Sequence, residues 1–533
     1  MSKTSLTTPA GSLGPTATSS QAGGQAAPRA VKWAIVATTL VALVLRLYEL
    51  SRPGYLLGIT EYDDGTDFGS AVRLVHGALP YRDFIMVQPP GITLIMAPVA
   101  AATKALGTAA GMATGRVLTV LASTAAVPLM GLLTRHRGLV AVIVSCGVVA
   151  IFPDSLTAAR TVLLEPWLVL FCLLGALAVF DGDRLAGPGR QFLGGLAFGF
   201  AGAVKVWAIL PVAVIFALTA RRPRQAAAYA LGVAAGFLVP VLPFAWTAPA
   251  TFYRSVVVAQ LVRSDVARIP LAYRLQHMLG LNHLPTLGTP ALIIIGAAVI
   301  VVIAVTFRLV SRLADSPPAL LDWFAIATTV LVAAAFLWPA DFYNHYAAFL
   351  APFLALALAL PVSRVLAALA PVEARQRGAV VLRRGVTAVA VLVILVLAIF
   401  QGIAESRLAS AFPATEIHAA ERMIRPGACV VTDQVSYTIM VDRFVSSDPR
   451  CSLIVDGVGT DYALSNGHNG LTGAARTPAV QALWWSAFRA AQYVWLTGTA
   501  DRRIPWTPQL RAYLSDHFRP LTNGPAWIYV RTR

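Results

Sequence analysis

Charged residues are scarce in this chain. Only 13% of its 533 residues are charged and 57% are hydrophobic, with a mean hydropathy of +0.69. Charged residues make up about a quarter of an ordinary soluble domain, so that class is excluded. Acidic residues are scarcest, with 25 Asp and Glu against 42 Lys and Arg and a net charge of +17. Many of the arginines stand in short loops between apolar runs, as the positive-inside bias produces. We therefore expect no nucleic acid partner.

Motifs for metals and nucleotides are absent from the sequence. It contains no HExxH, CxxC, Walker A or nucleotide-binding fingerprint, so nothing indicates ATP-driven transport or a nucleotide-sugar donor site. Cysteine is also rare, with four residues. Cys146 and Cys172 lie in apolar runs, where we expect inert packing residues. Cys429 and Cys451 each open an expected strand in the polar tail, where they form a disulfide in an oxidising compartment or remain two buried thiols.

Long apolar runs are what the chain has in abundance. Runs of about 18 to 20 residues recur, and each can cross about 30 Å of hydrocarbon. They are continuous rather than alternating, which favours helices over a barrel. We therefore expect a polytopic α-helical membrane protein with about eleven transmembrane helices within residues 31–405. The expected helices cover residues 31–50, 116–133, 139–152, 162–180, two short segments of 192–220 that meet near Lys205, 226–246, 291–310, 321–338, 347–362 and 386–403.

The two ends of the chain differ from this apolar body. Residues 1–30 are dominated by Ser, Thr, Gly, Ala and Pro, so we expect a disordered cytoplasmic N-terminus. Residues 412–533 have the composition of a soluble domain, and expected strands alternate there with expected helices, which predicts a small α/β domain. The strands are 428–432, 452–456, 493–497 and 527–531, and the helices are 417–424 and 481–491. The basic loops place this domain on the extracytoplasmic side of a multi-pass protein of the plasma membrane.

The most polar interval of the body is the expected outer loop 51–115. It holds Glu61, Asp63, Asp64 and Asp67 within seven residues. Adjacent carboxylates repel, which raises the pKa of one of them and suits a general base. The alternative is a solvated acidic turn. An amphipathic segment and a Pro-Pro turn follow and favour a fixed loop, and residues 91–107 beyond them are expected to lie on the membrane surface rather than to span it.

Other polar residues stand at the expected outer surface. Lys205 is alone in an apolar stretch, where it binds a phosphate or snorkels to the interface. Arg160 and Glu165 flank the start of helix 162–180, and they either pair with each other or line the site. His345 and Tyr346 open helix 347–362 as ligands or as interfacial residues. Arg46, near the end of the first helix, snorkels or meets an anion.

The order of four segments resembles the GT-C glycosyltransferases, multispanning enzymes that take a sugar from a polyprenyl-phosphate lipid. Leu45-Arg46-Leu47 ends the first helix and the acidic pair Asp63-Asp64 follows, where the family keeps its catalytic acid. Tyr81-Arg82-Asp83-Phe84 with Pro89-Pro90-Gly91 looks like the family's tyrosine–arginine–aspartate and Pro-Pro segment. Many relatives have Asp-Glu in place of Asp63-Asp64, so which acid is the base stays open.

The other two segments lie further along the chain. Gly195, Gly199, Ala201 and Lys205 resemble the family's glycine-rich helix ending in lysine. Asn344-His345-Tyr346 with Pro352 looks like the histidine–tyrosine start of a late helix. The resemblance covers residues 31–405 and is to the protein O-mannosyltransferase and aminoarabinose transferase branch, and to mannosyl- and arabinosyltransferases of actinobacterial envelopes.

The resemblance implies inverting transfer of mannose or an arabinose-like pentose from a polyprenyl-phosphate donor. The acceptor is an envelope glycan, a glycolipid or a protein on the outer face of the bilayer. Asp63 or Asp64 is the expected base, and no obligatory metal cofactor is expected, although a divalent ion remains an alternative. The expected substrate-binding residues are Arg46, Glu61, Arg82, Asp83, Gln88, Arg160, Glu165, Lys205, His345 and Tyr346. A transporter or lipid flippase of envelope precursors, which should show paired repeats, and a non-enzymatic scaffold are the rival hypotheses.

Overall fold

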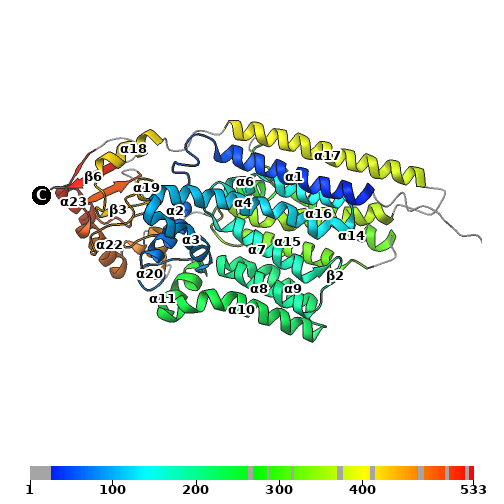
Figure 1. Cartoon of the computed structure of the whole chain (residues 1–533), viewed down its shortest axis with the longest axis horizontal. Helices are drawn as coiled ribbons and strands as arrows, with labels where there is room; N and C mark the ends of the chain where they lie inside the picture. The colour runs from blue at the N-terminus through cyan, green and yellow to red at the C-terminus, as the bar shows by residue number, and fades with distance from the viewer. Residues whose placement is uncertain are drawn as a thin grey trace, which may run out of the picture.

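The computed structural model describes most of the chain. The described residues are 26–261, 268–284, 287–313, 317–368, 376–407, 414–465, 473–497, 503–521 and 527–532. Residues 1–25 of the expected disordered N-terminus lie outside this set. The described part is mainly helical, and a small sheet domain lies at one end of the long axis (Figure 1).

Every stretch expected to cross the membrane is helical. The long apolar runs form α1 (Ala26–Leu50), α4 (Thr108–Thr134), α5 (Leu139–Ile151), α7 (Leu164–Val179), α8 (Pro188–Val204), α9 (Ile209–Thr219), α10 (Pro223–Thr247), α14 (Thr289–Leu313), α15 (Leu320–Leu337), α16 (Ala347–Ala368) and α17 (Gln376–Ser406). Short elements join them: η1 (Arg135–Arg137), α6 (Pro153–Ala159), β1 (Phe180–Asp181) with β2 (Arg184–Leu185), and η2 (Val206–Ala208). The helices run roughly along the long axis, with α1 beside α17 at one edge (Figure 1).

The number of full spans is smaller than the number of apolar helices. Within the described ranges, seven helices are long and apolar enough to cross a membrane, or eight if α5 and α6, bent by 54°, form one span. The helices α3 (Gly91–Leu106), α7 and the segment Val206–Thr219 are apolar but shorter. The expected break at Lys205 is confirmed, because α8 ends at Val204 and the chain resumes as η2 and α9. A polytopic α-helical membrane fold is therefore confirmed.

Glycines on the facing sides of α8 and α10 allow the backbones of the two helices to pack in direct contact. A Cβ on Gly195 would lie 2.4 Å from the carbonyl oxygen of Tyr229, and one on Gly199 would lie 2.3 Å from that of Val233. The partner helix contributes Gly236, whose Cβ would lie 2.2 Å from the oxygen of Leu196. Small residues permit this close approach of membrane helices. The glycines that resemble a family motif thus fix the helix that ends at Lys205.

A smaller set of elements lies between the long helices and the sheet domain. It consists of α2 (Tyr62–Val75) and α3 from the first polar loop, and α11 (Pro249–Tyr253), η3 (Arg254–Val258), α12 (Ala259–Leu261), α13 (Leu271–Met278) and η4 (Asn344–Tyr346) from later loops. Figure 1 shows α2 and α3 directly beside the C-terminal elements. Asp63 and Asp64 therefore lie in the first turn of a helix and not in the solvated acidic turn that was the alternative.

The C-terminal part contains a four-stranded sheet flanked by helices. The strand order is β3-β4-β6-β5, with β3 parallel to β4 and the other neighbours antiparallel. The elements are α18 (Ala414–Met423), β3 (Val430–Thr432), α19 (Val435–Met440), α20 (Gly457–Ser465), α22 (Pro478–Ala490), β4 (Tyr493–Leu496), α23 (Pro508–His517), β5 (Phe518–Pro520) and β6 (Trp527–Arg531). A sheet-containing C-terminal domain is thus present, and a disulfide joins Cys429 to Cys451.

One expected strand is wrong. Residues 452–456 form no strand, so Cys451 does not open one. This short run packs on two cores at once, because Val455 belongs to the main core and Ile454 lies against the core of the sheet domain. The remaining strand of the sheet is instead β5, which pairs with β6 and which the sequence did not indicate.

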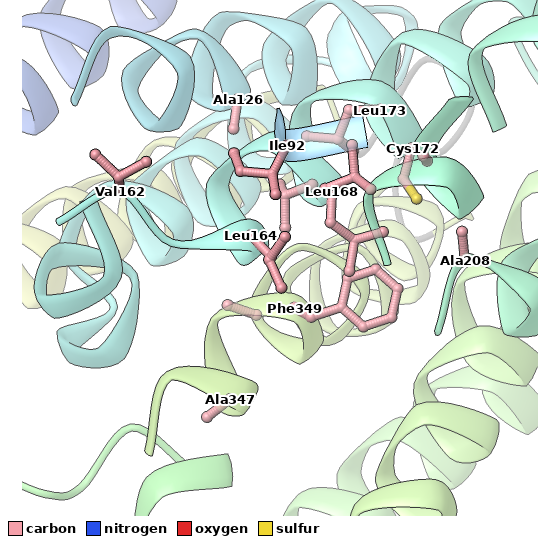
Figure 2. Close-up of a cluster of buried hydrophobic side chains, with 14 of the residues drawn as sticks. Ile92, Ala126, Val162, Leu164, Leu168, Cys172, Leu173, Ala208, Ala347 and Phe349 are labelled. Carbon is pink, nitrogen blue, oxygen red and sulfur yellow. The ribbon is translucent and has the colours of Figure 1, made fainter. Parts of the chain in front are cut away.

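The main core surrounds α7. Leu164, Leu168 and Cys172 of this helix are at most 5% exposed. Figure 2 shows them among side chains from neighbouring elements, including Ile92 of α3 and Phe349 of α16. The first loop and the late helix therefore pack on one common support, which sets the distance between their polar ends.

Candidate active site

A small polar cavity lies where the first loop, the α8–α9 break, the start of α16 and the C-terminal domain meet. Its volume is about 40 Å³. The side chains that line it come from residues far apart in the sequence: Tyr62, Asp63, Thr66, Asp67, Met86, Val87, Gln88, Leu163, Leu164, Glu165, Lys205, Tyr343, His345, Tyr346 and Asp456. Since one water needs about 10–15 Å³ of such space, the cavity holds a few waters and is smaller than a sugar.

The two adjacent acids of the first loop have different surroundings. Asp63 lines the cavity and is partly exposed. Across the described residues, no hydrogen bond or ion pair engages its carboxylate. Asp64, one residue on, is fully buried on the other side of α2. Its oxygens accept hydrogen bonds from Arg116 Nε at 3.0 Å and Nη2 at 2.5 Å, and from Val162 N at 2.8 Å. The structure therefore places Asp63 in the cavity and Asp64 in a buried ion pair outside it.

The other two acids of the loop also differ. Asp67 lines the cavity one helical turn after Asp63, and its Oδ2 atom has no hydrogen-bond partner. Burial, then the neighbouring Asp63 and Glu165, raise the pKa of Asp67 well above its usual range and favour the neutral acid. Glu61 precedes α2 and does not line the cavity. Burial, then Asp63, raise the pKa of Glu61 to about 7.

Lys205 is held at the cavity by an anion and two rings. Its Nζ lies 2.5 Å from Glu165 Oε1, 3.8 Å from the ring centroid of Trp207 and 4.5 Å from that of Tyr346. It is 5% exposed, so it does not snorkel. The second carboxylate oxygen of Glu165 is buried without a partner. The break between α8 and α9 therefore places the charged side chain of Lys205 in the wall of the cavity.

The late helix and the Pro-Pro turn complete the wall. His345 stacks on Tyr346 with ring centroids 5.1 Å apart, and both side chains line the cavity. Gln88 lines it from the first loop, where its backbone carbonyl accepts a hydrogen bond from Tyr81 OH at 2.6 Å. The cavity therefore contains six of the twelve site residues expected from the sequence: Asp63, Gln88, Glu165, Lys205, His345 and Tyr346.

The expected arginines lie elsewhere. Arg46 is 1% exposed and donates to Ser123 Oγ and to the carbonyls of Val149 and Ala150 at the end of α5. It therefore satisfies open carbonyls at a helix end and does not snorkel. Of the two alternatives for Arg160, pairing with Glu165 is wrong, because Arg160 forms an ion pair with Glu49. Arg160 does not line the cavity either.

The exposed tip of the first loop also lies outside the cavity. Arg82 pairs with Asp83 at 2.8 Å, and its side chain is 50% exposed. Asp83 also accepts from the amide of Leu79 at 2.7 Å. These contacts give the pair a role in shaping the turn that carries Tyr81, whose φ is +68°.

Most of the other cavity residues were not expected from the sequence, and Tyr343, Tyr62 and Asp456 are among them. Tyr343 precedes the histidine motif, and Tyr62 sits between two acids. Asp456 comes from the C-terminal domain and is 5% exposed. No signal in the sequence points to it, because it lies almost four hundred residues after its partner Tyr62, with a sequence separation of 394. In the part of the chain that the structure describes, no group of three or more metal-ligating side chains lies together.

Comparisons with known proteins bear on the class of the chain. Residues 87–335 match the model of glycosyltransferase family 87. No curated protein matches the sequence.

Solved structures share the fold over nearly the whole chain. Against ArnT from Cupriavidus metallidurans in the apo state, the TM-score is 0.58 at 15% identity, covering 95% of this chain and 98% of that one. The form of ArnT bound to undecaprenyl phosphate gives 0.59 at 15% identity, with 94% and 98% covered. The Archaeoglobus fulgidus oligosaccharyltransferase tethered with an acceptor peptide gives 0.52 at 11% identity, with 94% and 74% covered.

These relatives differ widely in sequence, so the structural likeness speaks for the fold alone. The family match covers the Pro-Pro turn, the buried support and the helix break at Lys205, but it does not include Asp63, His345 or Asp456 of the cavity. The chain therefore has a GT-C-like membrane fold, and residues 87–335 resemble glycosyltransferase family 87.

Proposed function

We propose that the chain transfers a sugar from a polyprenyl-phosphate donor to an acceptor hydroxyl, with inversion at the anomeric carbon. Asp63 takes the proton from the hydroxyl, whose oxygen forms the new bond to the anomeric carbon. The bond from that carbon to the phosphate oxygen breaks, and the polyprenyl phosphate leaves with the electron pair. The observation that carries the proposal is the placement of an unpaired carboxylate, Asp63, in one cavity with the cation Lys205.

The geometry assigns a role to each side of the cavity. Lys205 forms its cationic side and balances the charge that develops on the leaving phosphate, and His345 beside it can donate a hydrogen bond to that phosphate. Glu165 holds the ammonium of Lys205 in place until the donor arrives. The neutral form of Asp67 can donate a hydrogen bond to a sugar hydroxyl. Because this set supplies positive charge without a metal, transfer should not require a divalent ion.

The small volume of the cavity bears on how substrates enter. At about 40 Å³ it cannot contain a sugar, so its walls must separate when the donor binds. Loop and lid movements of this kind are common in enzymes that exclude water from the reaction. The walls are built from separate segments, among them the first loop and η4.

Relatives and the membrane setting support the choice of a lipid-linked donor. One ArnT structure is bound to undecaprenyl phosphate. The seven membrane-length apolar helices among the described residues would place this chain in the bilayer, where such a lipid resides. We propose a mannosyl or arabinose-like pentosyl group as the sugar, and an envelope glycan, glycolipid or protein as the acceptor. The disulfide Cys429–Cys451 favours an oxidising side of the plasma membrane for the C-terminal domain, and hence a cytoplasmic N-terminus.

The test is sugar transfer by purified protein in lipid. Radiolabelled mannosyl- and pentosyl-phosphate polyprenols are offered to wild type, Asp63→Asn, Lys205→Met and the control Asp516→Asn, which changes an exposed acid on α23. We expect wild type and the control to consume one donor and the other two variants to lose at least about 100-fold in rate. EDTA should leave the wild-type rate unchanged. Full activity in Asp63→Asn, or no donor consumed by wild type, would refute the proposal.

A further inference from the structure

The C-terminal domain holds the first turn of α2, the helix that carries Asp63. The backbone carbonyl of Glu61 accepts hydrogen bonds from Gln434 Nε2 at 2.9 Å and from Ser436 Oγ at 3.0 Å. The hydroxyl of Tyr62 donates to Asp456 Oδ1 at 3.0 Å and accepts from the amide of Val458 at 3.1 Å. Four hydrogen bonds from one domain thus converge on the two residues that precede Asp63.

The same surface is in tight van der Waals contact. A Cβ on Gly65 would lie 2.3 Å from Ser436 Oγ and 2.4 Å from Ser436 N. The guanidinium of Arg503 lies 5.0 Å above the ring of Tyr62, a distance at which cation–π attraction operates. The first turn of α2 is therefore seated against the domain, and it has no room to rotate without losing these contacts.

Asp456 is itself rigidly held. Its Oδ1 also accepts from the amide of Gly459 at 2.8 Å, so it caps the N-terminus of α20. One carboxylate oxygen thus joins the end of one helix to the hydroxyl that anchors another. Asp456 can cap α20 without Tyr62. The hydroxyl of Tyr62 makes an additional bridge between Asp456 and the amide of Val458.

We propose that the C-terminal domain completes the active site by fixing the orientation of Asp63, with Tyr62 and Asp456 as positioning residues. This role rests on the proposed function only in naming Asp63 as the base. The domain then acts on the rate of the chemical step rather than on capture of the acceptor. A displacement of about 1 Å in a reacting group can cost about 100-fold in rate, which sets the scale of the effect.

The experiment compares three variants with wild type and Asp516→Asn. Tyr62→Phe keeps the ring and removes the hydroxyl. Asp456→Ala removes the acceptor, whereas Asp456→Asn keeps an oxygen that can accept from Tyr62 OH and from the amide of Gly459. The measurements are kcat, the KM for each substrate, and amide hydrogen exchange of α2 in the full-length protein.

The positioning role predicts a split in the kinetics. Tyr62→Phe and Asp456→Ala should lower kcat by about 10- to 100-fold with both KM values within about twofold of wild type, and exchange of α2 should accelerate. Asp456→Asn should retain kcat within about threefold because the hydrogen bonds survive. If Asp456→Ala does not fold, Tyr62→Phe carries the test alone.

Two results would overturn the proposal. In the first, Asp456→Asn and Asp456→Ala raise the KM for the acceptor equally while kcat stays at the wild-type value. That result would make Asp456 a substrate-binding residue. In the second, α2 exchanges at the wild-type rate in Tyr62→Phe. Failure of the proposed function is seen separately, since wild type would then consume no donor, while the exchange of α2 would still report whether the domain fixes this helix.

Discussion

The neighbouring acids Asp63 and Asp64 should respond in opposite ways to the same substitution. Asp64 and its partner Arg116 are both fully buried. Changing Asp64 to Asn leaves the guanidinium of Arg116 in the interior without a counter-ion, and it turns one acceptor oxygen into a donor that faces other donors. Breaking a buried pair in this way costs about 3–5 kcal/mol. Asp63 makes no such contact, so Asp63→Asn should change the free energy of unfolding by less than about 0.5 kcal/mol.

The two variants should lose activity for different reasons. Asp63→Asn removes the proposed base and should lower kcat by about 100- to 10,000-fold in a protein of normal stability. Any loss in Asp64→Asn should follow its loss of folded protein. Thermal unfolding in detergent, followed by transfer assays on the folded fraction, separates the two effects.

A third variant sharpens this test. Asp64→Asn combined with Arg116→Met removes both charges, so part of the stability lost in Asp64→Asn should return. The reasoning is refuted if Asp64→Asn melts like wild type, or if Asp63→Asn destabilises the protein by several kcal/mol.

The remaining predictions concern pH, packing and redox state. Because folding raises the pKa of Glu61 from 4.5 to about 7, the free energy of unfolding should fall as the pH rises between these two values. Glu61→Gln should weaken this dependence of the melting temperature on pH. An equal dependence in both proteins would contradict the raised pKa of Glu61. Gly199→Ala should destabilise the helix pair by about 1–3 kcal/mol, whereas Gly202→Ala, whose Cβ would lie 3.4 Å from Phe237, should be tolerated; equal melting of the two variants would count against close packing. Replacing Cys429 and Cys451 by Ser should cost about 2–4 kcal/mol in unfolding by urea, and no change would show that the bond is absent.

The helical body could be predicted from the sequence because long apolar runs have few other solutions in a membrane. The break at Lys205 was predicted too, since a charged residue in a run too long for one helix marks its end. Within the described ranges, seven or eight helices are long and apolar enough to span a membrane, fewer than the eleven expected helices, because some of these, such as α7, are apolar yet short.

The site was predictable in its residue types and less so in its geometry. Asp63 and Asp64 are equivalent in sequence, and the tertiary partners of Asp64 distinguish them: Arg116, 52 residues away, and Val162, 98 residues away. The sequence left open whether Arg160 pairs with Glu165 or lines the site, and its partner is Glu49, 111 residues earlier. Pairings of this kind depend on tertiary contacts that leave no local pattern.

The contacts between the first turn of α2 and the C-terminal domain have a consequence for biosynthesis. Their partners are separated by 373 to 396 residues. At a synthesis rate of about 5–20 residues per second, the ribosome needs roughly 20–80 s to make the intervening chain. Until then Asp63 sits on a helix end without its support. Both segments must also reach the same face of the membrane. A truncated or inverted chain would therefore insert its helices without the support that we propose for Asp63, so the proposed transfer should reach its full rate only after the C-terminal domain has been made and placed.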